Sequence, residues 1–333
     1  MRLSVLAAVA AVTLGAAFAP AATRAAGEGP RLSFPLACEI GRTCEVQHYV
    51  DRDPGPGVSD YRCGHRTYDK HNGIDIRLLD LAAQRRGVDV LAAAPGRVAR
   101  LRDGVADISV RTPGAPSVTG QECGNGVVID HGDGWETQYC HVAKGSVRVK
   151  VGDIVKAGTP IARVGLSGQT EFPHLHLTVR RAGQIVDPFA PAATAPGSCA
   201  AQASMWTPAA AKALAYKAGV ILNAGFAAAP VTNETIEAGG IAAPTSASAA
   251  LVAYMRVVEP QRGDELEITL RGPDGATLAV NRLPPLDRDK AQYFTMLGRK
   301  RPPTGWKPGR YSAELKVWRA GKVALQKRID ANL

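Results

Sequence analysis

The sequence predicts a mainly β protein, in which a compact antiparallel β domain is followed by a smaller Ig-like β-sandwich. Between Val88 and Gln184 short apolar runs are interrupted by Gly and Pro, as where residues 127–129 precede a Gly-rich turn. Alternating strands return from Ala250 onward, and the segment 188–249 in between is rich in Ala, Pro, Gly, Ser and Thr. Two β regions joined by a connecting segment follow from this pattern.

The length of 333 residues exceeds what one hydrophobic core usually supports, so about two domains are expected. In the connecting segment, Thr207 and Pro208 stand ahead of an Ala-rich run that ends at Gly219, which predicts one capped helix. The expected division is a leader at 1–26, an N-terminal segment at 27–70, the principal β domain at 71–190, a connection with one helix at 191–249 and the β-sandwich at 250–333.

Individual strands can be placed from their turns. Residues 147–165 alternate strand and tight turn at close intervals, which is typical of a small sandwich or barrel. In the second β region, residues 266–270 alternate strictly and the turn 272–275 follows them. Residues 311–317 are expected to pair with residues 323–329 as a hairpin.

The N-terminus has the layout of a secretory signal peptide: Met1-Arg2, an uncharged apolar run over residues 3–19, then small residues up to Ala26. An uncleaved membrane anchor is the alternative, but the run is Ala-rich and no polar stop-transfer cluster follows it. We therefore expect export to the periplasm or cell wall, or secretion, with no stable membrane span after cleavage.

The chain is basic, with 40 Lys and Arg against 30 Asp and Glu and a formal net charge of +10. Losing Arg2 and Arg24 with the leader would lower this charge to +8. A basic exported protein suits polyanionic surroundings such as cell-wall polymers. Nucleic acid is excluded as a partner, because it lies in another compartment and the basic C-terminal residues lack interleaved aromatic side chains.

Cysteine usage agrees with export, because an even set of six in an exported chain is expected to be oxidised. Sequence alone does not select among the possible pairings. A Cys38–Cys44 bridge is locally easy and a Cys123–Cys140 bridge would lie near the open end of one predicted hairpin, which leaves Cys63 with Cys199. The chain has no CxxC motif, so a zinc knuckle is not indicated.

Two histidine motifs indicate a metal site. The first is His71-Asn-Gly73-Ile-Asp75, which runs into the apolar alternation of a strand. Residues four apart in an extended strand are roughly 13 Å apart, too far to share an ion, so the chain must bend, and Gly73 permits the bend. Both side chains can then face one ion.

The second motif is His174-Leu-His176. Residues i and i+2 of a strand point to the same face, so both imidazoles enter one cavity. Two His and one Asp match a three-ligand catalytic zinc site with one open position. A single strand histidine is more often a satisfied core residue, but that interpretation does not explain the two motifs together.

The remaining histidines are interpreted one by one. His141 ends a predicted strand and could reach the same cavity. His65 begins a second HxxxD spacing without the glycine or the apolar strand, so it is interpreted as loop. His131 and His48 are expected to be surface or structural residues.

These motifs also resemble a known family. The blocks HNGIDI, VVIDHGDGWETQYCHV, VKVGDIVKAGTPIARVGLSGQT and PHLHLTV occur in the order and spacing of the lysostaphin-type (LytM-like) peptidoglycan zinc metallopeptidases. The resemblance spans residues 71–188. It implies a fold of the duplicated hybrid motif type, one Zn²⁺ per chain held by His71, Asp75 and His176, and catalytic imidazoles at His141 and His174. Family members that have lost activity lack some of these five residues.

The reaction that the resemblance implies is hydrolysis of peptide bonds in peptidoglycan crosslinks or stems. Zinc lowers the pKa of bound water to about 7, so the protein must add a proton acceptor and an oxyanion stabiliser. His174 is the candidate general base and His141 the candidate stabiliser, although the two could exchange roles. The helix-borne HExxH motif is absent, so no Glu of that kind supplies the base.

Several alternatives stay open. The same fold could serve a regulator that binds peptidoglycan or activates another hydrolase, but the complete His and Asp set argues against a dead site. Residues 151–161 resemble turns of biotinyl or lipoyl carriers, yet no exposed lysine tip of the carrier type is present. D-alanyl–diaminopimelate crosslinks are the first expected substrate and glycyl–glycine bridges the second.

The flanking parts allow further interpretations. The segment 165–173 either walls the cleft or is an ordinary turn. Residues 31–60 could shield the site, and the C-terminal domain could bind an envelope partner, cover the cleft or only pack.

Overall fold

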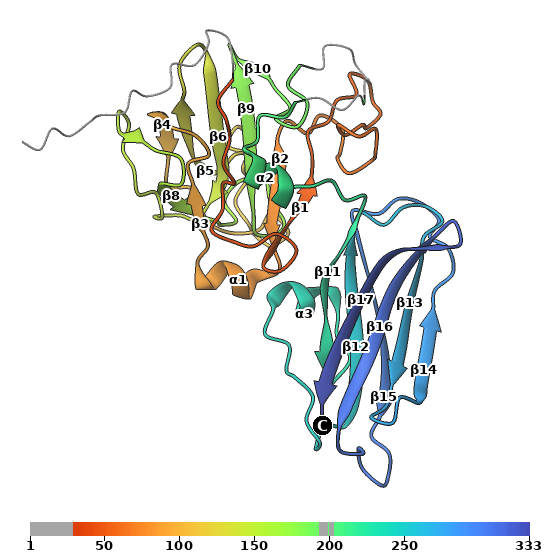
Figure 1. Cartoon of the computed structure of the whole chain (residues 1–333). Coiled ribbons are helices and arrows are strands. Elements are labelled where there is room, and N and C mark those ends of the chain that lie inside the picture. Colours follow the sequence, from red (N-terminus) through yellow and green to blue (C-terminus); the bar gives the residue numbers. More distant parts are fainter. Residues whose placement is uncertain (1–28, 193–198, 200–202) are drawn as a thin grey trace, which may run out of the picture.

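The chain folds into two β-rich parts that lie side by side (Figure 1). The computed structural model describes residues 29–192, 199 and 203–333. The N-terminal part contains one large antiparallel sheet, and the C-terminal part contains two smaller antiparallel sheets. Helices α1 and α3 face each other where the two parts meet. The predicted mainly β, antiparallel fold class is confirmed.

The large sheet has the strand order β1-β2-β9-β6-β5-β4-β7, with β10 paired to β9, and β3 and β8 form a separate pair. Short Gly-containing turns join most neighbouring strands. The elements of this part are β1 (Cys44–His48), β2 (Ile74–Leu78), α1 (Leu81–Arg86), β3 (Asp89–Leu91), β4 (Gly96–Arg102), β5 (Asn125–Asp130), β6 (Trp135–Val142), β7 (Ile154–Val155), β8 (Pro160–Arg163), β9 (His174–Arg181) and β10 (Gln184–Ile185).

At β1 and β2 the large sheet is buried on both faces, one with apolar and one with polar side chains. On β2, Ile74 and Ile76 belong to the hydrophobic core. Asp75 and Arg77 lie between and beyond them and point to the opposite face, because side chains alternate along a strand. Both of these charged residues are also buried. The polar face of β2 therefore carries charges that need partners.

The predicted boundary at residue 70 separates an N-terminal segment from the principal β domain. In the structure the two are continuous. Strand β1 pairs with β2, and Val46 and Tyr49 are buried in the common core. Leu32 also joins this core and exchanges backbone hydrogen bonds of 2.8 Å with Met205 and Thr207. The strand pairing is non-local, which explains why sequence patterns did not reveal it.

The predicted connection at 191–249 is partly wrong. Helix α2 (Pro208–Ala213) has Thr207 as its N-cap and Pro at its start, as predicted, but it stops well before Gly219. The segment also contains β11 (Val220–Ala227) and a second helix, α3 (Asn233–Ala238). The Ala and Gly residues of β11 weaken its strand signal, and β11 forms by pairing with β12 in the sheet.

The C-terminal part is a sandwich of the sheets β11-β12-β15 and β14-β13-β16-β17, which share one apolar core. The predicted 272–275 turn joins β13 to β14, and the predicted hairpin is β16 with β17. An Ig-like relationship stays a prediction. The remaining strands are β12 (Ala250–Val258), β13 (Glu265–Arg271), β14 (Thr277–Arg282), β15 (Gln292–Lys300), β16 (Arg310–Arg319) and β17 (Lys322–Asn332).

Disulfides are present, as the even cysteine count predicted. The pairs are Cys38–Cys44, Cys123–Cys140 and Cys63–Cys199. The last closes a loop of 136 residues, and long loops restrict the unfolded chain most. The second joins a long loop to β6, beside the site described below.

The predicted leader at 1–26 lies outside the described residues. Among the residues that the structure does describe, no helix has the length and apolar character needed to cross a membrane.

Asp187 near the end of the N-terminal part gives a testable pH dependence. It is buried, its Oδ1 accepts a 2.9 Å bond from the Phe189 N–H, and its Oδ2 has no partner. Burial raises the pKa of the Asp187 carboxyl to about 6. Because the folded pKa lies above the unfolded value of about 3.9, the folded state favours the protonated acid and loses stability as pH rises from about 4 through 6.

Asp187→Asn removes this titration. Between pH 4 and pH 7 the parent should lose up to about 3 kcal/mol of its free energy of unfolding, which corresponds to a pKa difference of about two units between the folded and unfolded states. The variant should not show this loss, so its stability relative to the parent should rise over this pH range. Urea unfolding of both proteins at several pH values measures the difference. A constant difference across this range would contradict the assignment.

Candidate metal centre

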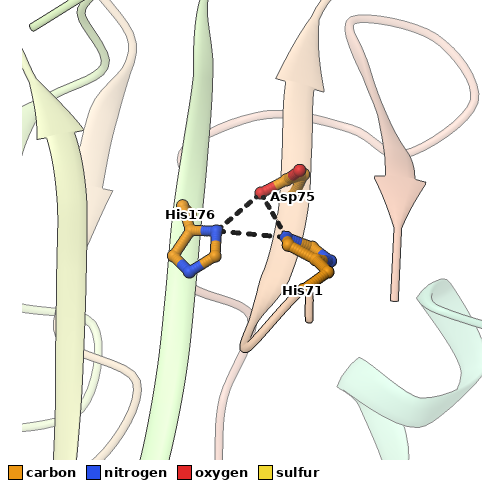
Figure 2. A group of neighbouring side chains, drawn as sticks. All are labelled: His71, Asp75 and His176. Atoms are coloured by element: carbon orange, nitrogen blue, oxygen red, sulfur yellow. Dashed lines mark hydrogen bonds and ion pairs between the residues drawn. The ribbon is translucent and has the colours of Figure 1, made fainter. Parts of the chain in front are cut away.

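Three side chains converge on the polar face of the large sheet: His71, Asp75 and His176 (Figure 2). His71 Nε2 lies 3.2 Å from His176 Nδ1 and 3.2 Å from Asp75 Oδ1. His176 Nδ1 lies 2.8 Å from the same carboxylate oxygen. The three atoms form a small triangle whose members could all contact one ion.

Strand register places two of these side chains. On the antiparallel pair β2 and β9, Asp75 lies directly opposite His176. Directly opposed residues of neighbouring strands project from the same face with their Cβ atoms about 5 Å apart. The carboxylate and the imidazole therefore meet without any bend in either strand.

His71 reaches the triangle because the chain bends before β2. The bend lies at Gly73, as the sequence predicted. A Cβ atom at Gly73 would lie 2.5 Å from His176 Nε2 and 2.7 Å from the Leu177 carbonyl oxygen. Glycine is thus required for close approach of the bend to β9.

Hydrogen bonds fix which nitrogen of each imidazole carries a proton. His71 Nδ1 is 2.6 Å from the Tyr49 carbonyl oxygen, which can only accept, so Nδ1–H donates to it. His176 Nε2 is 2.9 Å from Asn72 Oδ1 and donates in the same way. The lone pairs of His71 Nε2 and His176 Nδ1 consequently point into the triangle with that of Asp75.

This donor set fits zinc. With metal–ligand distances of about 2.0–2.1 Å, a tetrahedral zinc ion separates its ligand atoms by about 3.3 Å. The observed separations of 2.8 to 3.2 Å are close to that edge. Three lone pairs at this spacing repel one another unless a cation lies between them. Nitrogen and carboxylate ligands are the ones zinc prefers in catalytic sites.

The charge state of Asp75 suits a metal ligand. Burial alone would raise its pKa, but the neighbouring imidazoles, His71 first among them, hold the pKa of Asp75 well below its ordinary value. The carboxylate is therefore ionised at neutral pH even though it is buried.

Two further imidazoles flank the triangle. The ring of His141 lies 4.6 Å from that of His174 and 5.9 Å from that of His176, measured between centroids. His174 Nε2 is 3.5 Å from Asp75 Oδ1. All five predicted site residues thus belong to one cluster.

His141 reaches this cluster through an irregularity in β6. The β5–β6 register shifts between Asn125 and Val127, and His141 itself has φ +61°, in the left-handed region that non-glycine residues rarely adopt. A bulge of this kind turns a side chain away from its regular direction. Strain at a single histidine beside a metal triangle indicates a functional constraint.

The segment 165–173 orients both flanking imidazoles. His141 Nδ1–H donates to the Ser167 carbonyl at 2.8 Å, and His174 Nδ1–H donates to the Phe172 carbonyl at 2.9 Å. Their Nε2 lone pairs are left to face the cluster. The same segment also contributes Gln169 to the cleft wall.

Both flanking histidines are neutral at physiological pH. Burial lowers the pKa of His174 to about 4, and burial together with the neighbouring His174 and His176 lowers the pKa of His141 well below its ordinary value. A neutral imidazole can accept a proton, so both side chains are in the state that a general base requires.

A cleft of 270 Å³ opens over the cluster and exposes it to a ligand. Its rim carries both signs of charge and an exposed aromatic ring. The lining side chains outside the cluster include Tyr68, Lys70, Asn72, Glu122, Gln138 and Arg180.

Of the other three histidines, two lie away from the cluster and one contacts it. His65 lies in an exposed loop, as predicted, and is 2.8 Å from Asp289. His131 bonds the Pro95 carbonyl and Thr137 in a turn away from the cluster. His48, predicted to be surface or structural, is buried, with its Nδ1 3.0 Å from Asp75 Oδ2. Only the pairing of β1 with β2, which brings His48 opposite Asp75, could have revealed this.

Residues 69–188 match the model of Peptidase family M23. This region of the chain is similar to an M23 peptidase domain. All five clustered residues lie inside the matched region, and the lysostaphin-type resemblance is confirmed.

Proteins with similar sequences include both enzymes and an activator. The DD-carboxypeptidase/endopeptidase Mpg of Neisseria meningitidis is 33% identical over 130 residues, which is 39% of this chain and 24% of Mpg. The murein hydrolase activator EnvC of Escherichia coli is 45% identical over 62 residues, which is 19% of this chain and 14% of EnvC. The chain thus spans less than a quarter of either relative.

Among solved structures, a mutant catalytic domain of the M23 protein EnpA from Enterococcus faecalis is similar. It is 25% identical, with a TM-score of 0.32, and the match covers 45% of this chain and 92% of that domain.

The metal ligands can be tested by substitution. Asp75→Ala removes the only carboxylate of the triangle, so we expect zinc affinity to fall at least 100-fold. His174→Ala is expected to keep bound zinc, because its side chain lies outside the triangle. Titration against a chromophoric chelator measures both. Loss of zinc from the His174 variant would mean that ligand and base are exchanged.

The close approach at Gly73 gives a second test. Gly73→Ala should displace His176 and weaken zinc binding by about tenfold or more, because the added Cβ overlaps its ring. Gly104→Ala is the matched control, since a Cβ there meets nothing within 4 Å. Equal zinc affinities of the two variants would contradict the proposed geometry.

Proposed function

We propose that the protein is a zinc-dependent endopeptidase that hydrolyses peptide bonds in peptidoglycan crosslinks or stems. The observation that carries the proposal is the convergence of three lone pairs, from His71, Asp75 and His176, beside two neutral imidazoles in an open cleft. Similarity to the M23 peptidase family supports the same reaction class.

Bound zinc would supply Lewis acidity and lower the pKa of a coordinated water to about 7. His174 is the proposed general base, because its Nε2 is unprotonated and lies closest to the triangle. His141 is the proposed hydrogen-bonding partner of the developing oxyanion, for which its Nε2 must carry a proton at that stage. The burial of both rings keeps water from competing for these bonds.

The rim of the cleft favours a peptide that carries carboxylates. Lys70 and Arg180 line it, and such cations attract the free carboxylates of a stem peptide. D-alanyl–diaminopimelate crosslinks therefore remain the first candidate substrate and glycyl–glycine bridges the second. Export to the periplasm or cell wall, or secretion, is supported by the three disulfides, which form and persist mainly in oxidising compartments.

A regulatory function is the second candidate. It is favoured by the similarity to the murein hydrolase activator EnvC of Escherichia coli. The intact cluster of five residues favours the enzyme.

Digestion of purified peptidoglycan distinguishes the two. The enzyme should convert crosslinked muropeptide dimers to monomers in walls of the matching chemotype, and a chelator should stop it. Mass analysis of the released fragments names the bond. Zinc-loaded protein that leaves every wall chemotype intact would favour the regulatory function.

The proposed role of His174 as general base is tested separately from zinc binding. His174→Ala should lower kcat by at least 100-fold with bound zinc retained, because a lost general base slows proton transfer. Turnover of a defined crosslinked muropeptide measures this. An unchanged kcat would remove His174 from the mechanism.

A further inference from the structure

The C-terminal sandwich touches the metal centre through one pair of side chains. Glu259 follows strand β12, and its Oε1 lies 3.2 Å from His48 Nε2. The other nitrogen of the same ring, Nδ1, lies 3.0 Å from Asp75 Oδ2. One imidazole thus joins a carboxylate of the second domain to a carboxylate of the metal triangle.

We propose that Glu259 and His48 are positioning residues that hold Asp75 in its metal-binding orientation, so that the C-terminal sandwich is a structural part of the metal centre. The inference rests on the proposed function insofar as Asp75 must be a metal ligand. It gives the second domain a defined role at the site.

The two oxygens of Asp75 have different partners. Oδ1 faces the imidazoles of the triangle, and Oδ2 faces His48. A hydrogen bond to the oxygen that does not face the metal stops the carboxylate from rotating. Partners of this type orient metal ligands and are worth about 10- to 100-fold in metal affinity.

His48 needs its own partner to perform this role. Its Nδ1 must carry a proton to donate to Asp75, and the ring must not turn. Glu259 fixes the ring at its far end, and the rings of Tyr68 and His71 pack against it with centroids 5.2 and 5.7 Å away. Both His48 and Glu259 are buried, so water does not replace either bond.

Glu259 is held in a backbone conformation that is unfavourable for its residue type. Its φ is +54°, in the left-handed region, and its N–H donates to the Ala291 carbonyl at 3.1 Å. A non-glycine residue in this region costs of order 1–3 kcal/mol, and such strain persists where the surrounding structure over-determines it. Here the strained residue is the one whose side chain reaches into the other domain.

A second contact, between a partly buried acid and two buried arginines, holds the two domains in register. Glu237 of α3 accepts hydrogen bonds from Arg77 of β2, at 2.8 Å, and from Arg256 of β12. Arg256 also donates to the Leu79 carbonyl at 2.9 Å. Ionic pairs of buried arginines fix orientation more than they add stability. They leave little freedom for Glu259 to move away from His48.

The test compares zinc affinity in the full chain. We expect Glu259→Ala to bind zinc at least tenfold more weakly than the parent, by competition with a chromophoric chelator, and to alter the visible spectrum of the Co²⁺-loaded protein. Glu259→Gln should recover most of this loss, because the amide oxygen can still accept from His48 Nε2–H.

Asp289→Asn is the matched control. Asp289 makes the other contact between a histidine of the N-terminal part and an acid of the sandwich, 2.8 Å from His65, but this pair is exposed and does not lead to the cluster. Its zinc affinity and cobalt spectrum should equal those of the parent. If Glu259→Ala does not fold, His48→Phe, which keeps a ring without nitrogens, takes its place with the same expected loss.

The result that overturns the proposal is a folded Glu259→Ala protein with parental zinc affinity and an unchanged cobalt spectrum. Because zinc binding is measured apart from hydrolysis, this failure is distinct from failure of the proposed function. A parent that binds zinc without cleaving peptidoglycan would refute the function and leave the positioning role to be judged on metal affinity.

Discussion

The candidate metal centre depends on the register of β2 against β9, which sets Asp75 opposite His176. Because side chains alternate along a strand, the same register sends Ile74, Ile76 and Leu177 into the apolar core. A slip of one residue would exchange the two faces, burying the ligands in the core and losing the site. The alternation of apolar and polar residues therefore stabilises the core and also brings the candidate ligands together on the other face. The neighbouring strand β1 extends this row by placing His48 beside Asp75.

Local sequence was sufficient to predict the ligand motifs, the bend at Gly73 and the hairpins of the second domain. Each of these depends on residues close together in the chain, where periodicity and turn chemistry are informative. It was not sufficient for His48, because the pairing of β1 with β2 closes a loop of more than twenty residues and leaves no local trace. Strand β11 was missed for a different reason. Its Ala and Gly residues have low strand propensity, so its pairing with β12 decides its conformation. The bulge that turns the His141 side chain toward the cluster forms between β6 and its partner strand β5, so local sequence does not reveal it either.

Two kinds of support position the cluster. Backbone carbonyls of Tyr49, Ser167 and Phe172 set the tautomers of three histidines, and Asn72 sets the fourth. These acceptors come from loops that flank the strands, so the loops determine the protonation pattern while the strands determine the distances. Glu259 adds support from the second domain, through His48. In this proposal, interdomain packing is coupled to metal affinity.

X-ray absorption at the zinc edge of the zinc-loaded chain tests the central claim most directly. The ligand set of His71, Asp75 and His176 predicts two imidazole nitrogens together with oxygen ligands, all at about 2.0–2.2 Å from the metal, and no sulfur. Replacing Asp75 by Ala should remove oxygen scattering and leave both imidazoles. A sulfur shell at about 2.3 Å, or three or more imidazoles in the first shell, would contradict the proposed centre.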